Sequence, residues 1–597
     1  MENNNKNIEK YFRKLSEEQE PKSFQNMDKV WDKIEQKLDK KETKKVVPFW
    51  KYAGIAAALL VFVSLGIRFI DYSEEGVKQH EEVEVNAIEL TLPMEEPEPE
   101  AEPAMIQDEI MIEGEIGFLE EENKHTNIVS ENSESYENFT ENPFESAQTN
   151  PVSTFSIDVD NASYTNIRRF LNNGQTVPKD AVRIEEMINF FKYDYAQPKG
   201  KHPFAIHTEY SDAPWNPNHK LLKIGLKGKE IPTDKLPKSN FVFLVDVSGS
   251  MEAPNKLPLL KSSLKVLLDE LRPDDRVSIV YYANNVGVLL EPTKASEKQK
   301  IVKVIDEMYA SGGTSGGGGI ELAYEMAEKH FIKNGNNRII LATDGDFNIG
   351  KSSDEEMQNL IEEKRKSGVF LTCLGFGMGN YKDSKLMTLS EKGNGNYAYI
   401  DNIQEANRFL GKEFRGNMFA IAKDVKIQIE FNPAHVQAYR LVGYESRKLR
   451  NEDFANDAVD AGELGSGHTV TALYEVIPVG VESKFYSQEP DLKYTKNTAK
   501  NNYQNELATV KFRYKKPKED KSIEMVQTIK NQSISLSRAS KDFKFASAVA
   551  WFGLKLRDSK LITNKETKDI VKLAKQGIQN DDDGYKAEFV RLAESVK

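Results

Sequence analysis

One short stretch of this chain narrows the choice of folds more than any other. Residues 241–245 form an uninterrupted apolar run, and Asp246, Ser248 and Ser250 follow it at alternate positions. A run of this length without polar residues is typical of a strand buried on both faces of a parallel sheet. In open α/β sheets, ligands bind at the carboxyl ends of the strands. The sequence therefore predicts one carboxylate and two hydroxyl groups at the place where such folds hold ligands.

The region from 239 to 412 alternates between short apolar runs and amphipathic helical patterns. Strand-like runs recur at 276–282, 338–343 and 369–375, and helical periodicity lies between them. Repeated alternation of strand and helix predicts a mostly parallel sheet with helices on both faces, which is a doubly wound α/β domain.

Two further loops at predicted strand ends carry oxygen ligands. The Gly-rich stretch 311–319 presents Thr314, and Asp344 follows the strand near 338–341. In a doubly wound sheet these loops converge with the first one on a single crevice. Two carboxylates and three hydroxyl groups form a hard oxygen set that suits Mg²⁺, with Mn²⁺ or Ca²⁺ as alternatives, and one position stays open for a carboxylate from a partner. The predicted metal ligands all carry oxygen at a strand end: Asp246, Ser248, Ser250, Thr314 and Asp344.

This pattern resembles the metal-ion-dependent adhesion site of von Willebrand factor A domains. That site combines Asp-x-Ser-x-Ser with a distant Thr and a distant Asp followed by Gly, and the chain matches every part. The resemblance implies Mg²⁺ binding and a protein partner that supplies an acidic side chain. The stretches 153–164, 182–189 and 467–474 also resemble bacterial YfbK-type proteins. Those proteins combine a family-specific N-terminal segment, a von Willebrand factor A domain and a C-terminal domain of unknown function.

Other kinds of chemistry would need residues that these stretches lack. A nucleotide-binding loop would need Gly-Lys-Ser or Gly-Lys-Thr after its glycines, and 311–319 lacks it. A haloacid-dehalogenase-type transferase would need a carboxylate where Ser248 stands. A serine hydrolase would need a Gly-x-Ser-x-Gly elbow and a histidine placed as a base, and the sequence indicates neither. We therefore expect no catalysis. A metal-dependent hydrolase or phosphotransferase is the alternative, and a general base in the crevice would favour it.

Residues 49–70 predict a single transmembrane helix. With Lys51 and Arg68 at its ends, the apolar stretch reaches the roughly 20 residues that span a bilayer. Lysines precede it and acidic residues follow it, so the positive-inside rule puts the N-terminus in the cytoplasm and the bulk of the chain outside, in the periplasm or the extracellular space. YfbK-type proteins are often lipid-anchored, but the single cysteine, Cys373, is unsuited to that role, and a span is expected instead.

Charge and composition limit the partners. The formal net charge of −13 argues against nucleic acid, and the histidines are too scattered for a His-ligated zinc site. A second hypothesis makes the chain a signalling component, in which residues 1–45 report external binding to a cytoplasmic partner. We also expect Trp215 in a core, a structural role for His468, an inert buried thiol at Cys373, and a turn with a helix cap at 581–584.

The predicted organisation has seven parts. They are a cytoplasmic polar helical tail at 1–48, the span at 49–70, an acidic disordered linker at 71–150, a β-rich segment with helices at 151–238, the von Willebrand factor A domain at 239–412, a β-rich sandwich-like unit at 413–490, and a C-terminal domain of strands then helices at 491–597. Alternating patterns before 240 and after 420 also raise the hypothesis that both sets of strands share a sheet, with the α/β domain inserted between them.

Overall fold

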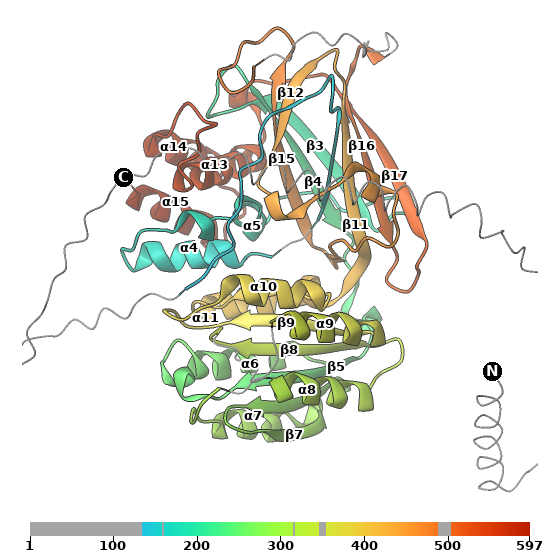
Figure 1. The fold of residues 1–597 in the computed structure, drawn as a ribbon, viewed down its shortest axis with the longest axis vertical. Helices are drawn as coiled ribbons and strands as arrows, with labels where there is room; N and C mark the ends of the chain where they lie inside the picture. The colour runs from blue at the N-terminus through green and yellow to red at the C-terminus, as the bar shows by residue number, and fades with distance from the viewer. Residues whose placement is uncertain (1–133, 158–159, 315–316, 346–353, 488–502, 597) are drawn as a thin grey trace, which may run out of the picture. The chain divides into compact units, whose positions relative to one another are not determined.

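The computed structural model describes residues 134–596, apart from 158–159, 315–316, 346–353 and 488–502 (Figure 1). The transmembrane helix predicted at 49–70 lies outside the described residues, as do the cytoplasmic tail and most of the acidic linker. Among the residues that are described, no helix is long and apolar enough to cross a bilayer.

Six strands form the central sheet of the α/β domain, in the order β10-β9-β8-β5-β6-β7. Neighbouring strands run parallel, except that β6 and β7 pair antiparallel. The strands are β5 Ser239–Asp246, β6 Arg276–Tyr282, β7 Val286–Lys294, β8 Asn336–Thr343, β9 Val369–Gly375 and β10 Tyr397–Tyr399. The α/β fold predicted from the alternation of strands and helices is confirmed.

Helices cover both faces of this sheet. Phe241, Phe243 and Val245 of β5 pack into one core with α6, α7 and the π-helical turn, whereas Val242 and Leu244 pack into another with α8, α9 and α10. Successive side chains of a strand point to opposite faces, so a strand between two helical layers has to be apolar throughout. The helices are α6 Leu257–Glu270, α7 Lys298–Glu307, α8 Gly317–Lys329, α9 Asp354–Lys364, α10 Asp383–Lys392, α11 Ile403–Ala406 and the π-helical turn Asn407–Lys412.

Two antiparallel sheets make up a sandwich outside the α/β domain (Figure 1). Their orders are β1-β12-β15-β4-β3 and β13-β2-β11-β16-β17, with β14 paired to β11. Each sheet contains strands from before residue 240 together with strands from residue 420 onward, so the α/β domain is an insertion in the sandwich sequence. The strands are β1 Glu145–Ser146, β2 Val152–Ser156, β3 Phe204–Asp212, β4 Lys220–Gly228, β11 Ala420–Phe431, β12 Val436–Val442, β13 Lys448–Leu449, β14 Leu464–Gly465, β15 Thr469–Pro478, β16 Glu506–Lys515 and β17 Ser522–Lys530.

A helical layer joins the two ends of the described chain. Helices α4 and α5, which precede the α/β domain, share an aromatic-rich core with α13, α14 and α15 from the C-terminal region (Figure 1). Helix α4 also contacts β10 of the α/β domain. The helices are α4 Ala162–Asn172, α5 Ile184–Phe190, α13 Lys541–Leu556, α14 Thr567–Gly577 and α15 Tyr585–Ser595.

Candidate metal-binding site at the strand ends

Asp246 ends β5 with a fully buried carboxylate that is hydrogen-bonded through both oxygens. Oδ1 accepts the backbone N–H of Ser248 at 2.9 Å and its hydroxyl at 2.6 Å. Oδ2 accepts the hydroxyls of Tyr282 and Thr343, each at 3.0 Å. Tyr282 ends β6 and Thr343 ends β8, the two strands that flank β5. The three strand ends therefore hold this carboxylate in one fixed orientation.

The two serines of the motif lie beside that carboxylate. The hydroxyl of Ser248 is 3.1 Å from the hydroxyl of Ser250, which is exposed. The N–H of Gly249 donates to the carbonyl of Gly312 at 2.8 Å, and a Cβ at Gly249 would lie 3.1 Å from that oxygen. The first loop is thus tied to the Gly-rich loop, which presents the half-buried Thr314 two residues later. Residues 315–316, which follow Thr314, lie outside the described residues.

Asp344 follows β8 at the same end of the sheet and is fully buried. The ammonium of Lys256 donates to its Oδ2 at 2.8 Å, and the side-chain amide of Asn380 donates to the same oxygen at 3.3 Å. The next residue, Gly345, has a φ of +90°, a conformation that glycine adopts without strain. The structure therefore brings Asp246, Ser248, Ser250 and Asp344 to the same end of the sheet, with the loop of Thr314 beside them.

The electrostatics of Asp246 suit a cation. Burial raises the pKa of Asp246 to about 6; hydrogen bonds from Ser248 oppose that rise, and the nearby charge of Asp344 adds to it. A carboxylate whose charged form is disfavoured by burial and by a second carboxylate gains stabilisation from a positive ion. The hydroxyl and carboxylate oxygens are the hard donors that Mg²⁺, Mn²⁺ or Ca²⁺ prefer, so the residues present fit such an ion. Metal binding by the five residues stays a prediction.

No group of three or more His, Cys, Asp or Glu side chains within the described part of the chain is arranged to hold a metal. A metal at the strand ends would therefore depend on hydroxyl oxygens as well as on two carboxylates, as the motif predicts. Sequence reasoning missed the groups that orient those carboxylates, which are Tyr282, Thr343, Lys256 and Asn380. Tyr282 and Thr343 could have been found, because each ends a strand that the sequence pattern predicts, at 276–282 and 338–343. Lys256 directly precedes α6, and the sequence pattern predicts an ordinary solvent-exposed lysine at such a position.

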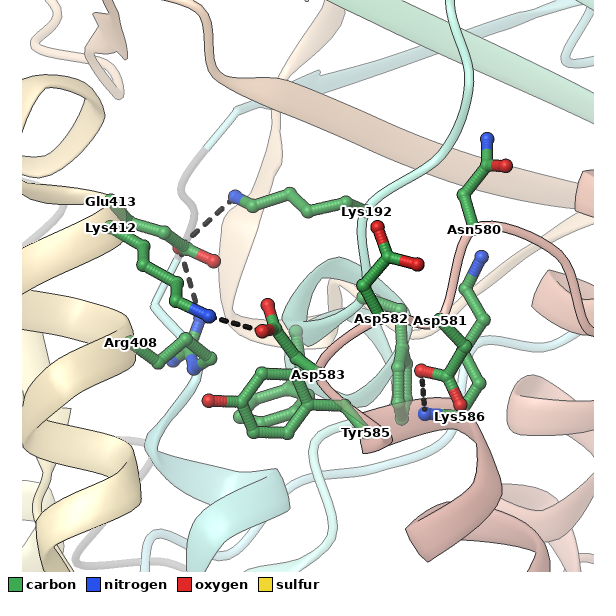
Figure 2. Close-up of a pocket in the computed structure, with 12 residues that line it drawn as sticks. Lys192, Arg408, Lys412, Glu413, Asn580, Asp581, Asp582, Asp583, Tyr585 and Lys586 are labelled. Carbon is green, nitrogen blue, oxygen red and sulfur yellow. Dashed lines mark hydrogen bonds and ion pairs between the residues drawn. The ribbon is translucent and has the colours of Figure 1, made fainter.

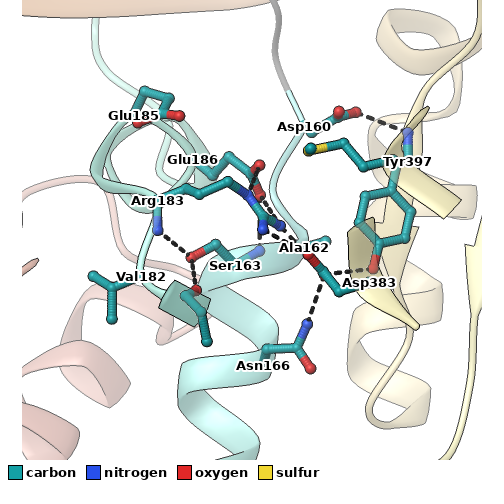
Figure 3. Close-up of polar contacts among 12 residues, drawn as sticks. Asp160, Ala162, Ser163, Asn166, Val182, Arg183, Glu185, Glu186, Asp383 and Tyr397 are labelled. Carbon is teal, nitrogen blue, oxygen red and sulfur yellow. Dashed lines mark hydrogen bonds and ion pairs between the residues drawn. The ribbon is translucent and has the colours of Figure 1, made fainter. Parts of the chain in front are cut away.

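A buried ionic cluster connects the α/β domain to α4 and α5 (Figure 3). Arg183, which precedes α5, donates to Asp383 at 2.6 Å and to Glu186, while the hydroxyl of Tyr397 donates to Asp383 at 2.7 Å. Asp383 begins α10, and Asn380 of the strand-end site lies three residues before it. We call Arg183, Glu186, Asp383 and Tyr397 the boundary cluster. It ties the start of α10, three residues after Asn380, to α5.

A pocket of about 270 Å³ lies beside the π-helical turn (Figure 2). Its charged lining is paired: Lys192 contacts Glu413 at 3.0 Å, and Lys412 contacts Asp583. Asp581 accepts the N–H of Lys586 at 2.8 Å, so the expectation of a turn with a helix cap at 581–584 is confirmed. Figure 2 shows Tyr585 and Arg408 against the same pocket.

A polar cluster around Glu475 places a histidine beside a serine. His219 contacts Glu475 through Nδ1 at 2.6 Å and Ser483 through Nε2 at 2.9 Å, which is the order of contacts in a hydrolase triad. Burial opposes the ionisation of Glu475, but the guanidinium of Arg440 holds its pKa below the ordinary value. Trp215 and Asn216 also donate to Glu475, at 2.9 and 2.5 Å.

The negative charge of Glu475 is therefore compensated by the guanidinium of Arg440, and the carboxylate does not serve His219 alone. We interpret the cluster as structural, since it fixes the turn before β4 to β15. Labelling of Ser483 by a fluorophosphonate would contradict that interpretation.

Three further expectations concern buried residues. Trp215 is fully buried, as predicted. Cys373 is fully buried in β9, and burial raises the pKa of its thiol, which agrees with an inert side chain. His468 is buried in the turn before β15, and burial together with the charge of Lys192 lowers its pKa to about 3, so its imidazole is neutral at physiological pH.

Comparison with protein families identifies the two main parts of the chain. Residues 240–411 match the von Willebrand factor type A domain, and residues 416–597 match the family described as "Uncharacterized protein YfbK, C-terminal". Residues 130–223 match a family described as "von Willebrand factor". Von Willebrand factor type A domains generally mediate protein–protein interactions and often carry a metal-ion-dependent adhesion site.

Individual relatives agree with these matches. "Uncharacterized protein YfbK" of Escherichia coli is 43% identical over 480 residues, which cover 79% of this chain and 82% of that protein. Inter-alpha-trypsin inhibitor heavy chain H3 of Mus musculus is 30% identical over 175 residues, covering 28% of this chain and 20% of the relative. A solved von Willebrand factor type A protein from Catenulispora acidiphila has 14% identity and a TM-score of 0.37, covering 64% of this chain and 89% of its own. The chain belongs to the YfbK family of von Willebrand factor type A domain proteins.

Proposed function

We propose that this chain binds a protein partner through a divalent cation held at the strand ends of its von Willebrand factor type A domain. The observation that carries this proposal is the pair of fully buried carboxylates, Asp246 and Asp344, at one end of the sheet with serine hydroxyls beside them. Asp246, Ser248, Ser250, Thr314 and Asp344 would hold the ion. A Mg²⁺ ion there supplies a positive centre that accepts a carboxylate from the partner.

The surface next to the site supports a protein rather than a small molecule as the partner. A depression of about 450 Å³ adjoins the first and second loops, and its lining includes Val247, Leu289, Met308 and Tyr309. Tyr309 is 75% exposed and Leu289 is 39% exposed. Exposed large apolar side chains around a polar site are typical of interaction surfaces, where aromatic residues contribute strongly to binding.

A non-enzymatic role is consistent with the domain and with the family. The contacts described for the two carboxylates come from Ser248, Tyr282, Thr343, Lys256 and Asn380. These groups are hydroxyls, an ammonium and an amide, and none of them is a histidine or a further carboxylate that could serve as a general base. The metal-dependent hydrolase that the sequence left as an alternative would need such a base.

The first test removes the carboxylate of Asp246. Asp246→Ala should abolish the rise in melting temperature that saturating Mg²⁺ gives to the wild-type protein, because the ion loses a charged ligand. Circular dichroism checks that the variant is folded, and Cys373→Ser serves as a control at a buried site outside the crevice. An unchanged response to Mg²⁺ in Asp246→Ala would overturn the metal-site proposal.

Membrane anchoring through residues 49–70 is the second part of the proposal. It is supported by the length of the apolar stretch and by the lysines before it. The domain would then face the periplasm or the extracellular space. A reporter enzyme that is active only outside the cytoplasm, fused after residue 75, should be active. A reporter active only in the cytoplasm should be inactive at the same position, and the reverse pattern would refute the topology.

A further inference from the structure

An ammonium group is built into the candidate metal site. The Nζ atom of Lys256 lies 2.8 Å from Oδ2 of Asp344 and 3.3 Å from the side-chain oxygen of Asn380. Asn380 in turn donates to the same oxygen of Asp344. The three side chains therefore form a closed set of contacts, although they come from the start of α6, the end of β8 and the loop after β9.

The backbone around Lys256 is shaped to admit its side chain. A Cβ on Gly377 would lie 2.4 Å from Cε of Lys256 and 2.7 Å from its Cγ, so only glycine leaves room for the aliphatic stem. Gly377 also has a φ of +77°, a conformation that suits glycine. The side chain of Lys256 is only 10% exposed. A lysine that is threaded past a glycine and held this deeply has a fixed position at the site.

We propose that Lys256 is an internal counter-cation, which weakens metal binding to the empty site and strengthens carboxylate binding to the metal-loaded site. This inference rests on the proposed metal site. The ammonium of Lys256 pairs with Asp344 when no metal is bound, and it repels a divalent ion that approaches the same carboxylate. Metal binding and partner binding would thereby be coupled, because the ammonium opposes the first and favours the second.

The charges of the three groups explain the direction of both effects. Among the described side chains that contact one another here, two carboxylates and one ammonium carry one net negative charge, so a divalent ion changes this sum to one positive charge. A carboxylate from a partner then brings the site to neutrality. Without Lys256 the loaded site would be neutral, and a partner carboxylate would leave a net negative charge in a buried crevice, which is unfavourable.

The test compares Mn²⁺ binding to the full-length wild-type protein and three variants by isothermal titration calorimetry. Lys256→Met keeps the stem but removes the charge, and Lys256→Gln keeps a hydrogen-bond donor without the charge. Lys261→Met is the matched control, since Lys261 lies on the same helix and donates to the carbonyls of Asp306 and Met308. Both Lys256 variants should bind Mn²⁺ roughly 10-fold tighter or more, from the loss of one repelling charge nearby. Lys261→Met should bind as the wild type does.

Thermal melting tests the same inference through the stability of the protein, independently of the calorimetric titration. The Lys256 variants should melt at a lower temperature than the wild type without metal and should gain more from saturating Mn²⁺, because they lose the ammonium that pairs with Asp344. Circular dichroism at low temperature shows that they are folded. A gain no larger than that of the wild type would count against the counter-cation.

Acetate tests the effect on a carboxylate. Titrated into Mn²⁺-saturated protein, acetate should displace metal-bound water and lower the water-proton relaxation rate. Its affinity should be several-fold weaker in Lys256→Met than in Lys261→Met, and equal affinities would overturn the coupling to a partner.

The outcomes separate this inference from the proposed function. If wild-type protein binds Mn²⁺, Asp246→Ala does not, and both Lys256 variants bind as the wild type does, the counter-cation is wrong and the metal site stands. If neither wild type nor any variant binds Mn²⁺, the metal site is wrong and the inference falls with it.

Discussion

The strand-end site and the boundary cluster both bury carboxylates, but they neutralise them differently. At the boundary, Arg183 contacts both Asp383 and Glu186, and nearby Arg168 contacts Asp401 and Glu405. Each of those carboxylates has a guanidinium partner. At the strand ends, by contrast, the contacts described for Asp246 come from hydroxyls and an N–H.

The contrast separates charges that fix the fold from charges that are available for binding. A guanidinium forms several hydrogen bonds in one plane and stays charged, so it satisfies a buried carboxylate permanently. Hydroxyls orient a carboxylate without cancelling its charge, and Lys256 at Asp344 is a single compact charge. Carboxylates left with a surplus of negative charge in a crevice are typical of functional sites. The boundary cluster holds two parts of the molecule together, whereas the carboxylates at the strand ends are the groups that would hold the proposed cation.

The largest effect is expected from breaking the boundary cluster. Arg183→Met should lower the free energy of unfolding by about 3–5 kcal/mol, because Asp383 and Glu186 would stay buried without their partner. Urea denaturation followed by circular dichroism measures the loss. The Mn²⁺ affinity of the folded protein should change far less, since Arg183 does not contact the strand-end carboxylates.

A surface pair serves as the control for that measurement. Lys303 and Glu307 lie 3.8 Å apart on α7, with side chains 76% and 65% exposed. Lys303→Met should leave the urea midpoint unchanged within error, because solvent screens such pairs. A boundary variant no less stable than this control would show that Arg183 contributes nothing to holding the domain in place.

Local patterns made much of the α/β domain predictable. The apolar run at 241–245 identified a strand with two buried faces, and the motif after it identified Asp246 and Ser248 at the strand end. Both features lie within a few residues of sequence, so no long-range information was needed. The sandwich was harder to predict, because β2 pairs with β11 and β4 with β15 across the whole inserted domain. Alternation predicts that a strand exists but does not name its partner.

The ionic contacts were beyond prediction for a related reason. Arg183 and Asp383 are 200 positions apart, and Lys256 and Asp344 are 88 apart. A charged residue in a helix or at its start reads as solvent-exposed, because most such residues are. The structure shows that Arg183 and Lys256 are instead buried and paired with carboxylates that are distant in the sequence. β17 was missed as well: its pattern is largely exposed at a sheet edge, with Val526 58% exposed.

A smaller effect is expected from pH, and it tests whether the imidazole of His468, which lies near Lys192 and Glu413, is neutral in the folded protein. The pKa of His468 is lowered to about 3, mainly by burial and then by Lys192, whereas an unfolded histidine titrates near 6.5. The unfolded chain therefore binds a proton first as the pH falls, so the stabilisation is complete above pH 6.5 and declines towards pH 3. Between pH 7 and pH 5 this one group should cost the wild type roughly 2 kcal/mol of unfolding free energy.

His468→Asn should lose less stability over that pH range, because it carries no titrating ring. The difference between the urea-derived free energies of the two proteins at pH 7 and pH 5 isolates His468 from the other titrating groups. His468→Gln repeats the comparison with a longer amide and guards against a local packing defect in one variant. Equal acid sensitivity in all three proteins would mean that His468 takes up its proton in the folded state as readily as in the unfolded chain. The folded protein would then accommodate a positive charge on His468 near Glu413. The difference between the boundary cluster and the strand-end site would be supported only by the arginine–carboxylate pairs.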